Sequence, residues 1–172
     1  MVMQARGSSR IILKETVVSK QACAQFARKC AAKLVKGDIV CLHGTLGAGK
    51  TFIAREMIRA ITGDNLAEVP SPTYTLAQTY DSQDFRIWHF DFYRLEDAEE
   101  IYEIGWDEAI SGNLVLIEWP EKAENLIPAY AKHLYIEFDK ADEETEKNLQ
   151  ENETRHLILT DTTRDLEKTR KP

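Results

Sequence analysis

The chain has 172 residues and a mass of 19.7 kDa, which fits one globular domain, and its 43% hydrophobic and 30% charged residues are ordinary for a soluble protein. No apolar run approaches the roughly 20 residues of a membrane span, which argues against a membrane role. The formal net charge of −7 argues against a primary nucleic-acid binder, because affinity for a phosphate backbone comes mainly from clustered Lys and Arg. We expect a single soluble domain over residues 1–172 that meets RNA only locally or through another protein.

The N-terminus and the cysteines both favour a cytoplasmic location. Residues 1–10 are polar and lack the apolar stretch of a signal peptide. The cysteines form no Cys-x-x-Cys pair and lie within apolar patterns, so we expect packed free thiols in a reducing compartment and no metal site there. They are Cys23, Cys30 and Cys41.

The first predicted elements frame a glycine-rich loop. Apolar residues at helical spacing predict an amphipathic helix over about residues 16–36, and Gly37 ends it. Residues 38–43 form a nearly continuous apolar run, as in a strand that is buried on both faces. Helical spacing resumes after Lys50 and lasts until Gly63, so the loop lies between a strand and a helix.

The middle of the chain combines a loop, two strands and short helices. Proline and hydroxyl side chains favour a looped or extended backbone over residues 68–79. Apolar runs predict strands over residues 85–90 and 114–117. Helical spacing over residues 95–110 predicts one or two short helices between these strands.

Two further strands, over residues 134–138 and 156–160, close the predicted fold. Between them lies a charged and polar stretch, residues 139–155, which we interpret as a solvated hairpin loop or a mobile insertion. The order of elements predicts an α/β fold: a P-loop NTPase-like sheet with flanking helices, a mostly parallel core and antiparallel closing strands. The ligand of such a fold lies at the carboxyl ends of the strands.

The loop carries the pattern Gly-x-x-x-x-Gly-Lys-Thr, which binds nucleotide phosphates. Glycine is needed because backbone N–H groups converge on phosphate oxygens with no Cβ in the way. Lys50 is expected to place its charge against the β- and γ-phosphates and the Thr51 hydroxyl to ligate Mg²⁺, while the following helix directs its positive dipole end at the anion. We assign nucleotide binding to Gly44, Leu46, Gly47, Ala48, Gly49, Lys50, Thr51 and Phe52.

A P-loop enzyme also needs a carboxylate at the end of a neighbouring buried strand, which holds Mg²⁺ through its water shell or orients the attacking water. Asp91 and Glu118 both follow such strands. Strand alternation puts His89 on the same side as Asp91, with Phe90 opposite, although a structural role is the more ordinary interpretation of this histidine. The candidate catalytic residues are Lys50, Asp91 and Glu118, and the candidate metal ligands are Thr51, Asp91 and Glu118.

Four neighbouring residues are open to two interpretations each. Ser71 and Thr73 lie where GTPases keep the loop that senses the γ-phosphate, or else in a plain turn; in the first case they bind nucleotide. Trp119 packs in the core or excludes water from the metal site. Arg94 reaches a phosphate or pairs with the acidic residues between positions 96 and 103.

Four motifs occur in a fixed order: Gly-x-Leu-Gly-Ala-Gly-Lys-Thr at 44–51, Ser-Pro-Thr-Tyr at 71–74, His-Phe-Asp-Phe-Tyr-Arg at 89–94 and Ile-Glu-Trp-Pro at 117–120. Together they resemble the bacterial TsaE family, also called YjeE, over about residues 11–138. The resemblance implies a small ATPase that uses ATP and Mg²⁺ and works with the TsaB and TsaD proteins. Their product is N6-threonylcarbamoyladenosine in tRNAs that read codons beginning with adenosine.

The resemblance also implies how the work is divided. TsaD performs the threonylcarbamoyl transfer, the ATPase serves the complex, and tRNA is met only indirectly through that complex. The implied residue roles are phosphate binding by Lys50 and the loop amides, Mg²⁺ binding by Thr51 and Glu118, hydrolysis requiring Asp91, and a switch-like segment containing Ser71 and Thr73.

Two other functions share the P-loop. Small-molecule kinases of similar size need a lid that carries arginines over the transferring phosphate, whereas the most lid-like segment, residues 121–132, has two lysines and no arginine. A GTP sensor usually reads guanine with an Asn-Lys-x-Asp motif, which the sequence lacks. The small-molecule kinase is therefore the stronger alternative to the ATPase.

Overall fold

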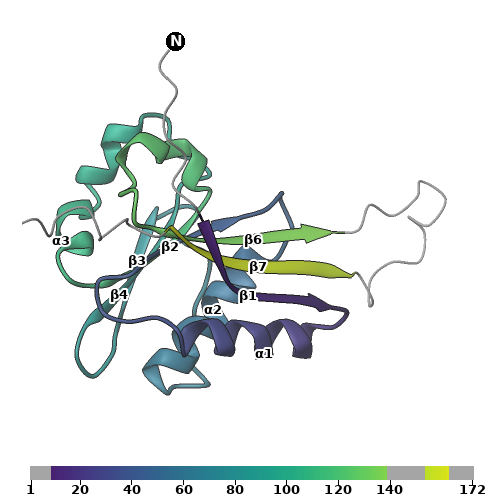
Figure 1. The fold of residues 1–172 in the computed structure, drawn as a ribbon. Helices are drawn as coiled ribbons and strands as arrows, with labels where there is room; N and C mark the ends of the chain where they lie inside the picture. Colours follow the sequence, from purple (N-terminus) through teal and green to yellow (C-terminus); the bar gives the residue numbers. More distant parts are fainter. Residues whose placement is uncertain (1–8, 139–153, 163–172) are drawn as a thin grey trace, which may run out of the picture.

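A seven-stranded mixed sheet forms the centre of the protein, which the computed structural model describes over residues 9–138 and 154–162 (Figure 1). The strand order is β1-β7-β6-β2-β5-β4-β3. The four central strands β6, β2, β5 and β4 are parallel, while β1, β7 and β3 join them by antiparallel pairing, so the predicted α/β architecture is confirmed. The strands are β1 (Ser9–Val17), β2 (Ile39–His43), β3 (Ala77–Asp81), β4 (Arg86–Asp91), β5 (Leu114–Glu118), β6 (Lys132–Phe138) and β7 (Arg155–Thr162).

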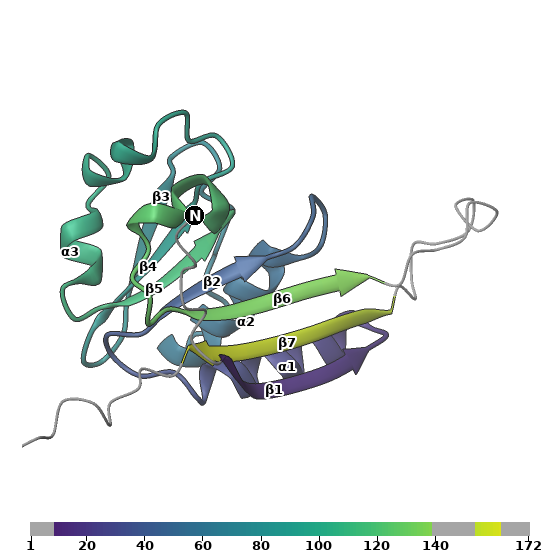
Figure 2. The same cartoon turned by 45° about the horizontal axis from the view of Figure 1, so that its top comes forward.

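Two long helices cover one face of the sheet, and three short ones contribute to the packing on the other. Helices α1 (Lys20–Ala31) and α2 (Lys50–Thr62) lie side by side under the sheet in Figure 1, and Figure 2 shows the same arrangement from a tilted view. The opposite face packs against the 3₁₀ helices η1 (Ala98–Tyr102) and η2 (Pro120–Leu126) and the short helix α3 (Trp106–Ile110). In the described part of the chain no helix is long and apolar enough to cross a membrane.

Strand β2 shows why the sheet needs cover on both faces. Val40 and Leu42 belong to the core cluster under α1 and α2, whereas Ile39 and Cys41 belong to the cluster on the other face. Side chains alternate across a strand, so a parallel strand between two helical layers is apolar throughout. The continuous apolar run predicted over residues 38–43 is this strand, shorter by one residue at its start.

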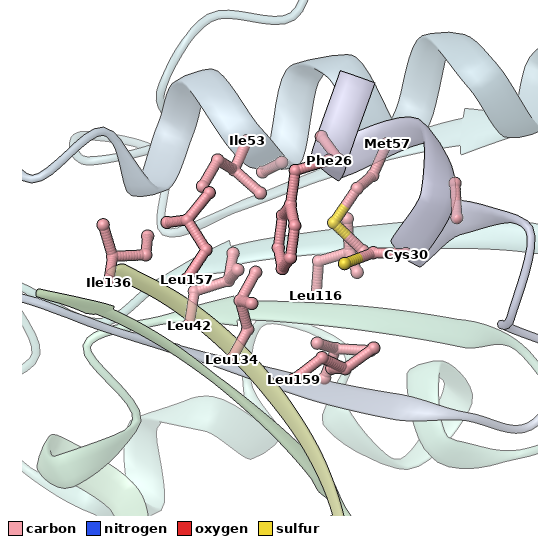
Figure 3. Close-up of a cluster of buried hydrophobic side chains, with 14 of the residues drawn as sticks. Phe26, Cys30, Leu42, Ile53, Met57, Leu116, Leu134, Ile136, Leu157 and Leu159 are labelled. Carbon is pink, nitrogen blue, oxygen red and sulfur yellow. The ribbon is translucent and has the colours of Figure 1, made fainter. Parts of the chain in front are cut away.

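The helix-side core depends on large side chains from both helices. Phe26 of α1 is fully buried and lies among Ile53 and Met57 of α2 and leucines of the sheet (Figure 3). Truncating such a side chain to alanine typically costs about 3–5 kcal/mol of stability. This packing fixes α2 against the sheet, and with it the loop from which α2 starts.

Helix α1 is shorter than the helix predicted over residues 16–36. Ser19 ends the preceding extended segment and caps the helix, because its hydroxyl accepts a hydrogen bond from the N–H of Ala22 at 3.1 Å. Thr16 and Val17 instead pair with β7 as the end of β1. The helix of α2, by contrast, runs from the loop to Gly63 as predicted.

Three further outcomes concern the remaining predictions. The strands over 85–90, 114–117, 134–138 and 156–160 and the short helices over 95–110 are confirmed to within a few residues, whereas β1 and β3 have no predicted counterpart. The charged stretch 139–155 lies outside the described residues apart from Thr154 and Arg155, and Arg155 begins β7. The cysteines are free and buried as expected, and burial raises the pKa of two of them, Cys30 and Cys41, to about 12.

Candidate active site

The phosphate-binding pattern lies in the turn between β2 and α2, the structural context that the motif requires. Gly49, just before α2, has φ of 100°, a conformation that side-chain-bearing residues rarely adopt. A Cβ added to Gly44 would lie 2.9 Å from the Ala48 Cβ and 3.0 Å from the Ile136 carbonyl oxygen. The loop therefore depends on glycine at its start for space and at its end for backbone conformation.

A cavity of about 340 Å³ opens at the carboxyl ends of β4 and β5, beside this loop. It collects nearly all the candidate site residues from four separate segments. Gly44 and Phe52 do not line it: Gly44 lies at the start of the loop, and Phe52 packs against the helix-side core. Tyr93 lines it without having been predicted. The lining residues are Leu46, Gly47, Ala48, Gly49, Lys50, Thr51, Ser71, Thr73, Asp91, Tyr93, Glu118 and Trp119.

Lys50 supplies the positive charge of this cavity. Its side chain is buried, and its ammonium donates hydrogen bonds to the carbonyl oxygens of Gly44 at 2.6 Å and Thr45 at 2.9 Å. The same nitrogen lies 3.7 Å from the centre of the Trp119 ring, within the range of a cation–π contact. Burial lowers the pKa of Lys50, and the neighbouring carboxylates, chiefly that of Glu118, oppose the shift.

Glu118 at the end of β5 is only 2% exposed, and both of its carboxylate oxygens have a partner. The Thr51 hydroxyl donates to Oε2 at 2.9 Å, and Nε2 of His89 lies 2.9 Å from Oε1. The predicted alternation along β4 is confirmed, since His89 and Asp91 face the site while Phe90 packs in the opposite core. His89 contacts Glu118 rather than Asp91.

Asp91 at the end of β4 ties the site to the segment after α2. Its Oδ2 accepts hydrogen bonds from Ser71 at 2.9 Å and Thr73 at 2.6 Å, and its Oδ1 accepts one from the Tyr93 N–H at 3.0 Å. Asp91 is also register partner to Glu118 on the adjacent parallel strand. The structure thus brings both acids and both hydroxyls to one edge of the sheet.

The segment that leads to Ser71 is anchored on α2 by two arginines that no sequence motif identifies. Arg55 donates through Nε to the carbonyl oxygen of Val69 at 2.9 Å, and Arg59 donates to that of Ala67 at 3.0 Å. Nothing in their spacing marks these contacts, since helical arginines are ordinarily solvated. The same helix therefore begins in the phosphate loop and fixes the path toward Ser71.

Trp119 and Arg94 both make ring contacts. The Trp119 ring contacts the Lys50 ammonium and also the Tyr93 ring, at 5.0 Å between ring centres, and it forms part of the cavity wall. The Arg94 guanidinium lies 4.2 Å from the centre of the exposed Tyr74 ring. Arg94 does not line the cavity, and among the described residues it has no ion pair with the acids that follow it.

A second group of rings lies on the other side of the loop. His43, the last residue of β2, stacks on Tyr135 with 4.7 Å between ring centres, and its Nε2 lies 2.9 Å from Nδ1 of His133. Burial, followed by the charges of His133 and Lys50, lowers the pKa of His43 to about 4. A neutral imidazole is thus held directly before the phosphate loop.

The residues present fit a Mg²⁺–nucleotide complex. Mg²⁺ prefers oxygen ligands and usually keeps several waters, binding proteins through one or two carboxylates and the phosphates of its nucleotide. The Thr51 hydroxyl and the carboxylates of Glu118 and Asp91 provide such oxygens beside the loop. Across residues 9–138 and 154–162 no group of three or more His, Cys, Asp or Glu side chains is placed to hold a metal ion.

Comparison with known proteins gives the family. The family model described as "Threonylcarbamoyl adenosine biosynthesis protein TsaE" matches residues 17–149. Proteins named "tRNA threonylcarbamoyladenosine biosynthesis protein TsaE" are 47% identical in Rickettsia conorii, over 65% of this chain and 63% of that protein, and 47% identical in Rickettsia prowazekii, over 65% and 77%. The protein of that name in Haemophilus influenzae is 40% identical over 60% of this chain and 68% of its own length.

The fold also matches a solved structure, that of YdiB from Bacillus subtilis, with a TM-score of 0.65 over 91% of this chain and 88% of YdiB. At 21% identity this likeness concerns the fold alone. The family match, by contrast, extends over most of the chain and includes all four motifs identified in the sequence. The chain belongs to the TsaE family.

Proposed function

We propose that this protein binds ATP with Mg²⁺ and hydrolyses it to ADP and phosphate, as a subunit required to form N6-threonylcarbamoyladenosine in tRNAs that read codons beginning with adenosine. The observation that carries the proposal is the meeting of a phosphate loop, a buried lysine and two buried carboxylates in one cavity. Family membership and the names of the curated relatives support the pathway.

Phosphate binding in this proposal rests on the loop and on Lys50. The N-terminus of α2, which begins at Lys50, lies at the cavity, and the free backbone N–H groups and positive dipole end of a helix N-terminus suit triphosphate oxygens. On nucleotide binding, the ammonium of Lys50 exchanges its two carbonyl partners for β- and γ-phosphate oxygens. Because this charge is already buried, it pairs strongly with the developing charge of the transferring phosphoryl group.

In this proposal Thr51 and Glu118 would hold Mg²⁺, and Asp91 would act on the attacking water molecule. Mg²⁺ held there would supply positive charge that stabilises the phosphate oxygens during hydrolysis. Asp91 lies beside Glu118 in register, and its carboxylate accepts hydrogen bonds, so it can orient the attacking water. Ser71 and Thr73 then make the position of Asp91 depend on the conformation of their segment.

The proposed partners are TsaB and TsaD, with tRNA met through their complex, in the cytoplasm. A net charge of −7 supports an indirect rather than a direct role toward tRNA. The exposed side chains of Leu46 and Tyr93, at the cavity, offer apolar contact area to a partner that covers the nucleotide. Partner binding there would gate turnover by closing the cavity to bulk water while the attacking water molecule stays in place.

The test is reconstitution. Phosphate release is measured for the protein alone and with TsaB and TsaD, and tRNA modification is measured with and without the protein. We expect slow release alone, faster release in the complex, and modification that requires the protein with an intact Lys50. Rapid partner-independent turnover would contradict gating, and modification unaffected by omitting the protein would contradict the pathway role. Phosphorylation of a metabolite in place of water would identify a small-molecule kinase.

A further inference from the structure

His89 is a fully buried polar residue in the middle of the site region. It lies on β4 in register with Leu116 of β5, two pairs before the Asp91–Glu118 pair. Its neighbour two residues earlier, Ile87, belongs to the core cluster under α1 and α2, so both side chains face the helices. From this position the imidazole reaches along β5 to Glu118, with 2.9 Å between Nε2 and Oε1.

The chemistry of the pair fixes where the hydrogen lies. A carboxylate only accepts hydrogen bonds, so Nε2 of His89 must be the donor. Nδ1 is buried and has no hydrogen-bond partner among the described residues. If the hydrogen of a neutral ring lies on Nε2, only a lone pair is left without a partner at Nδ1. If it lies on Nδ1 instead, the N–H there has no acceptor and Nε2 faces Glu118 with a lone pair.

This donor completes the support of the Glu118 carboxylate. Oε1 accepts from His89 and Oε2 accepts from Thr51, so the two oxygens are held from opposite sides of the group. Rotation of the carboxylate breaks both hydrogen bonds and buries an unpaired charge, which is costly at 2% exposure. One oxygen of Glu118 is thereby directed toward the Thr51 hydroxyl.

We propose that His89 is a positioning residue for Mg²⁺ binding: by donating Nε2–H to Oε1 it orients Glu118 so that Oε2 and the Thr51 hydroxyl face the metal together. The inference rests on the proposed function, because it concerns the Mg²⁺ of the same site. Partners that orient metal-binding groups in this way typically change metal affinity by roughly 10-fold to 100-fold when removed. His89 itself touches neither the nucleotide nor the reacting atoms.

The experiment measures ADP binding to the full chain by calorimetry, once with excess Mg²⁺ and once with EDTA. The ratio of the two dissociation constants gives the contribution of Mg²⁺ without any need for turnover. In His89→Leu we expect this ratio to fall by roughly 10-fold to 100-fold, with the affinity in EDTA unchanged. His89→Gln should keep most of the ratio, because its amide reaches the Nε2 position, whereas His89→Asn, whose amide reaches only the Nδ1 position, should not.

Two controls separate a positioning role of His89 from a merely structural one. In Glu118→Ala the His89→Leu change should no longer alter the Mg²⁺ ratio, because the group that it orients is absent. Ile87→Ala, which removes packing from the same face of β4, should lower thermal stability and leave the ratio unchanged. If His89→Leu does not fold, the comparison of the Gln and Asn variants gives the same answer.

The outcomes are distinct. An unchanged Mg²⁺ ratio in His89→Leu and His89→Asn would overturn the inference and leave the proposed function intact. A reduction that persists in the Glu118→Ala background would also overturn it, since the effect would then bypass Glu118. A wild-type ADP affinity that does not respond to Mg²⁺ would overturn the magnesium site of the proposed function itself, and the inference with it.

Discussion

Removing the Asp91 carboxylate should release the segment of residues 71–73 from the sheet. Its two oxygens accept three hydrogen bonds, from the hydroxyls of Ser71 and Thr73 and from the N–H of Tyr93. Asp91→Ala deletes all three while leaving the strand backbone in place. We therefore expect a local loss of order next to the cavity rather than global unfolding.

The size of the effect follows from the exposure of the donors. Hydrogen bonds to a charged group contribute about 1.5–3 kcal/mol each. Ser71 is exposed and Thr73 half-buried, so water replaces the carboxylate for much of their loss, and the sum of three bonds overstates the effect. We therefore use the value of a single bond: the opening free energy of the segment falls by about 1.5–3 kcal/mol, which makes the open state roughly 10-fold to 100-fold more populated.

Amide hydrogen exchange reports this opening directly. The N–H of Leu76, just after the segment, donates to the carbonyl of Pro72 inside it, so the protection of this N–H measures whether the segment is in place. Exchange at Leu76 should accelerate in Asp91→Ala and stay at the wild-type rate in Asp84→Ala, which removes an exposed carboxylate elsewhere. ADP affinity should change little, while phosphate release falls. Wild-type exchange at Leu76 combined with lost turnover would refute the idea that Asp91 orders the segment.

Three further predictions concern the loop and its surroundings. Lys50→Ala should weaken ATP binding by roughly 100-fold or more, because the loss of a buried charge against phosphate costs at least about 3 kcal/mol, and tight binding in a filter assay would contradict the role of the loop. Glu118→Ala should slow phosphate release more than it weakens ADP binding; the reverse order would argue against a metal ligand. The pKa of His43 is about 4 in the folded protein, against an ordinary value of 6.5, so the unfolded chain binds more protons between pH 4 and pH 6.5. The stability that is present above pH 6.5 is therefore lost as the pH falls toward 4. Denaturant titrations at pH 7 and pH 5 should give a loss of up to about 2 kcal/mol that His43→Gln lacks, and equal losses in both proteins would assign the pH dependence to other groups.

The sequence predicted the parallel core well because its strands are apolar on both faces and its central turn is rich in glycine. β2 and β5 are short, nearly continuous apolar runs, a pattern that is typical of buried parallel strands. β1 and β3 went unpredicted because they lie at the two edges of the sheet, where most of their side chains are exposed or half-buried and neither strand is a continuous apolar run. Their pairing is decided by neighbours far away in the sequence, such as β7 for β1.

The candidate site shows a similar division. A motif predicted which side chains line the cavity, and strand alternation placed His89 and Asp91 on the same face. Side-chain contacts could not be predicted in this way, because they depend on conformations that tertiary packing sets. Examples are the contact of His89 with Oε1 of Glu118 and the hydrogen bond from Arg55 to the backbone before Ser71. Tyr93 was missed because an aromatic residue just after a strand end usually indicates packing rather than a cavity wall.

The alignment of Asp91 with Glu118 on adjacent strands constrains how this family can change its site. Register in a sheet shifts only in whole residues, and a shift by one turns every side chain to the opposite face. A single insertion or deletion within β4 would bring Phe90 or Phe92 opposite Glu118 and send the second carboxylate into the apolar core. The lengths of β4 and β5 themselves are therefore fixed, and within these strands residues can change only by substitution. Insertions can accumulate in the loops that enter and leave the two strands.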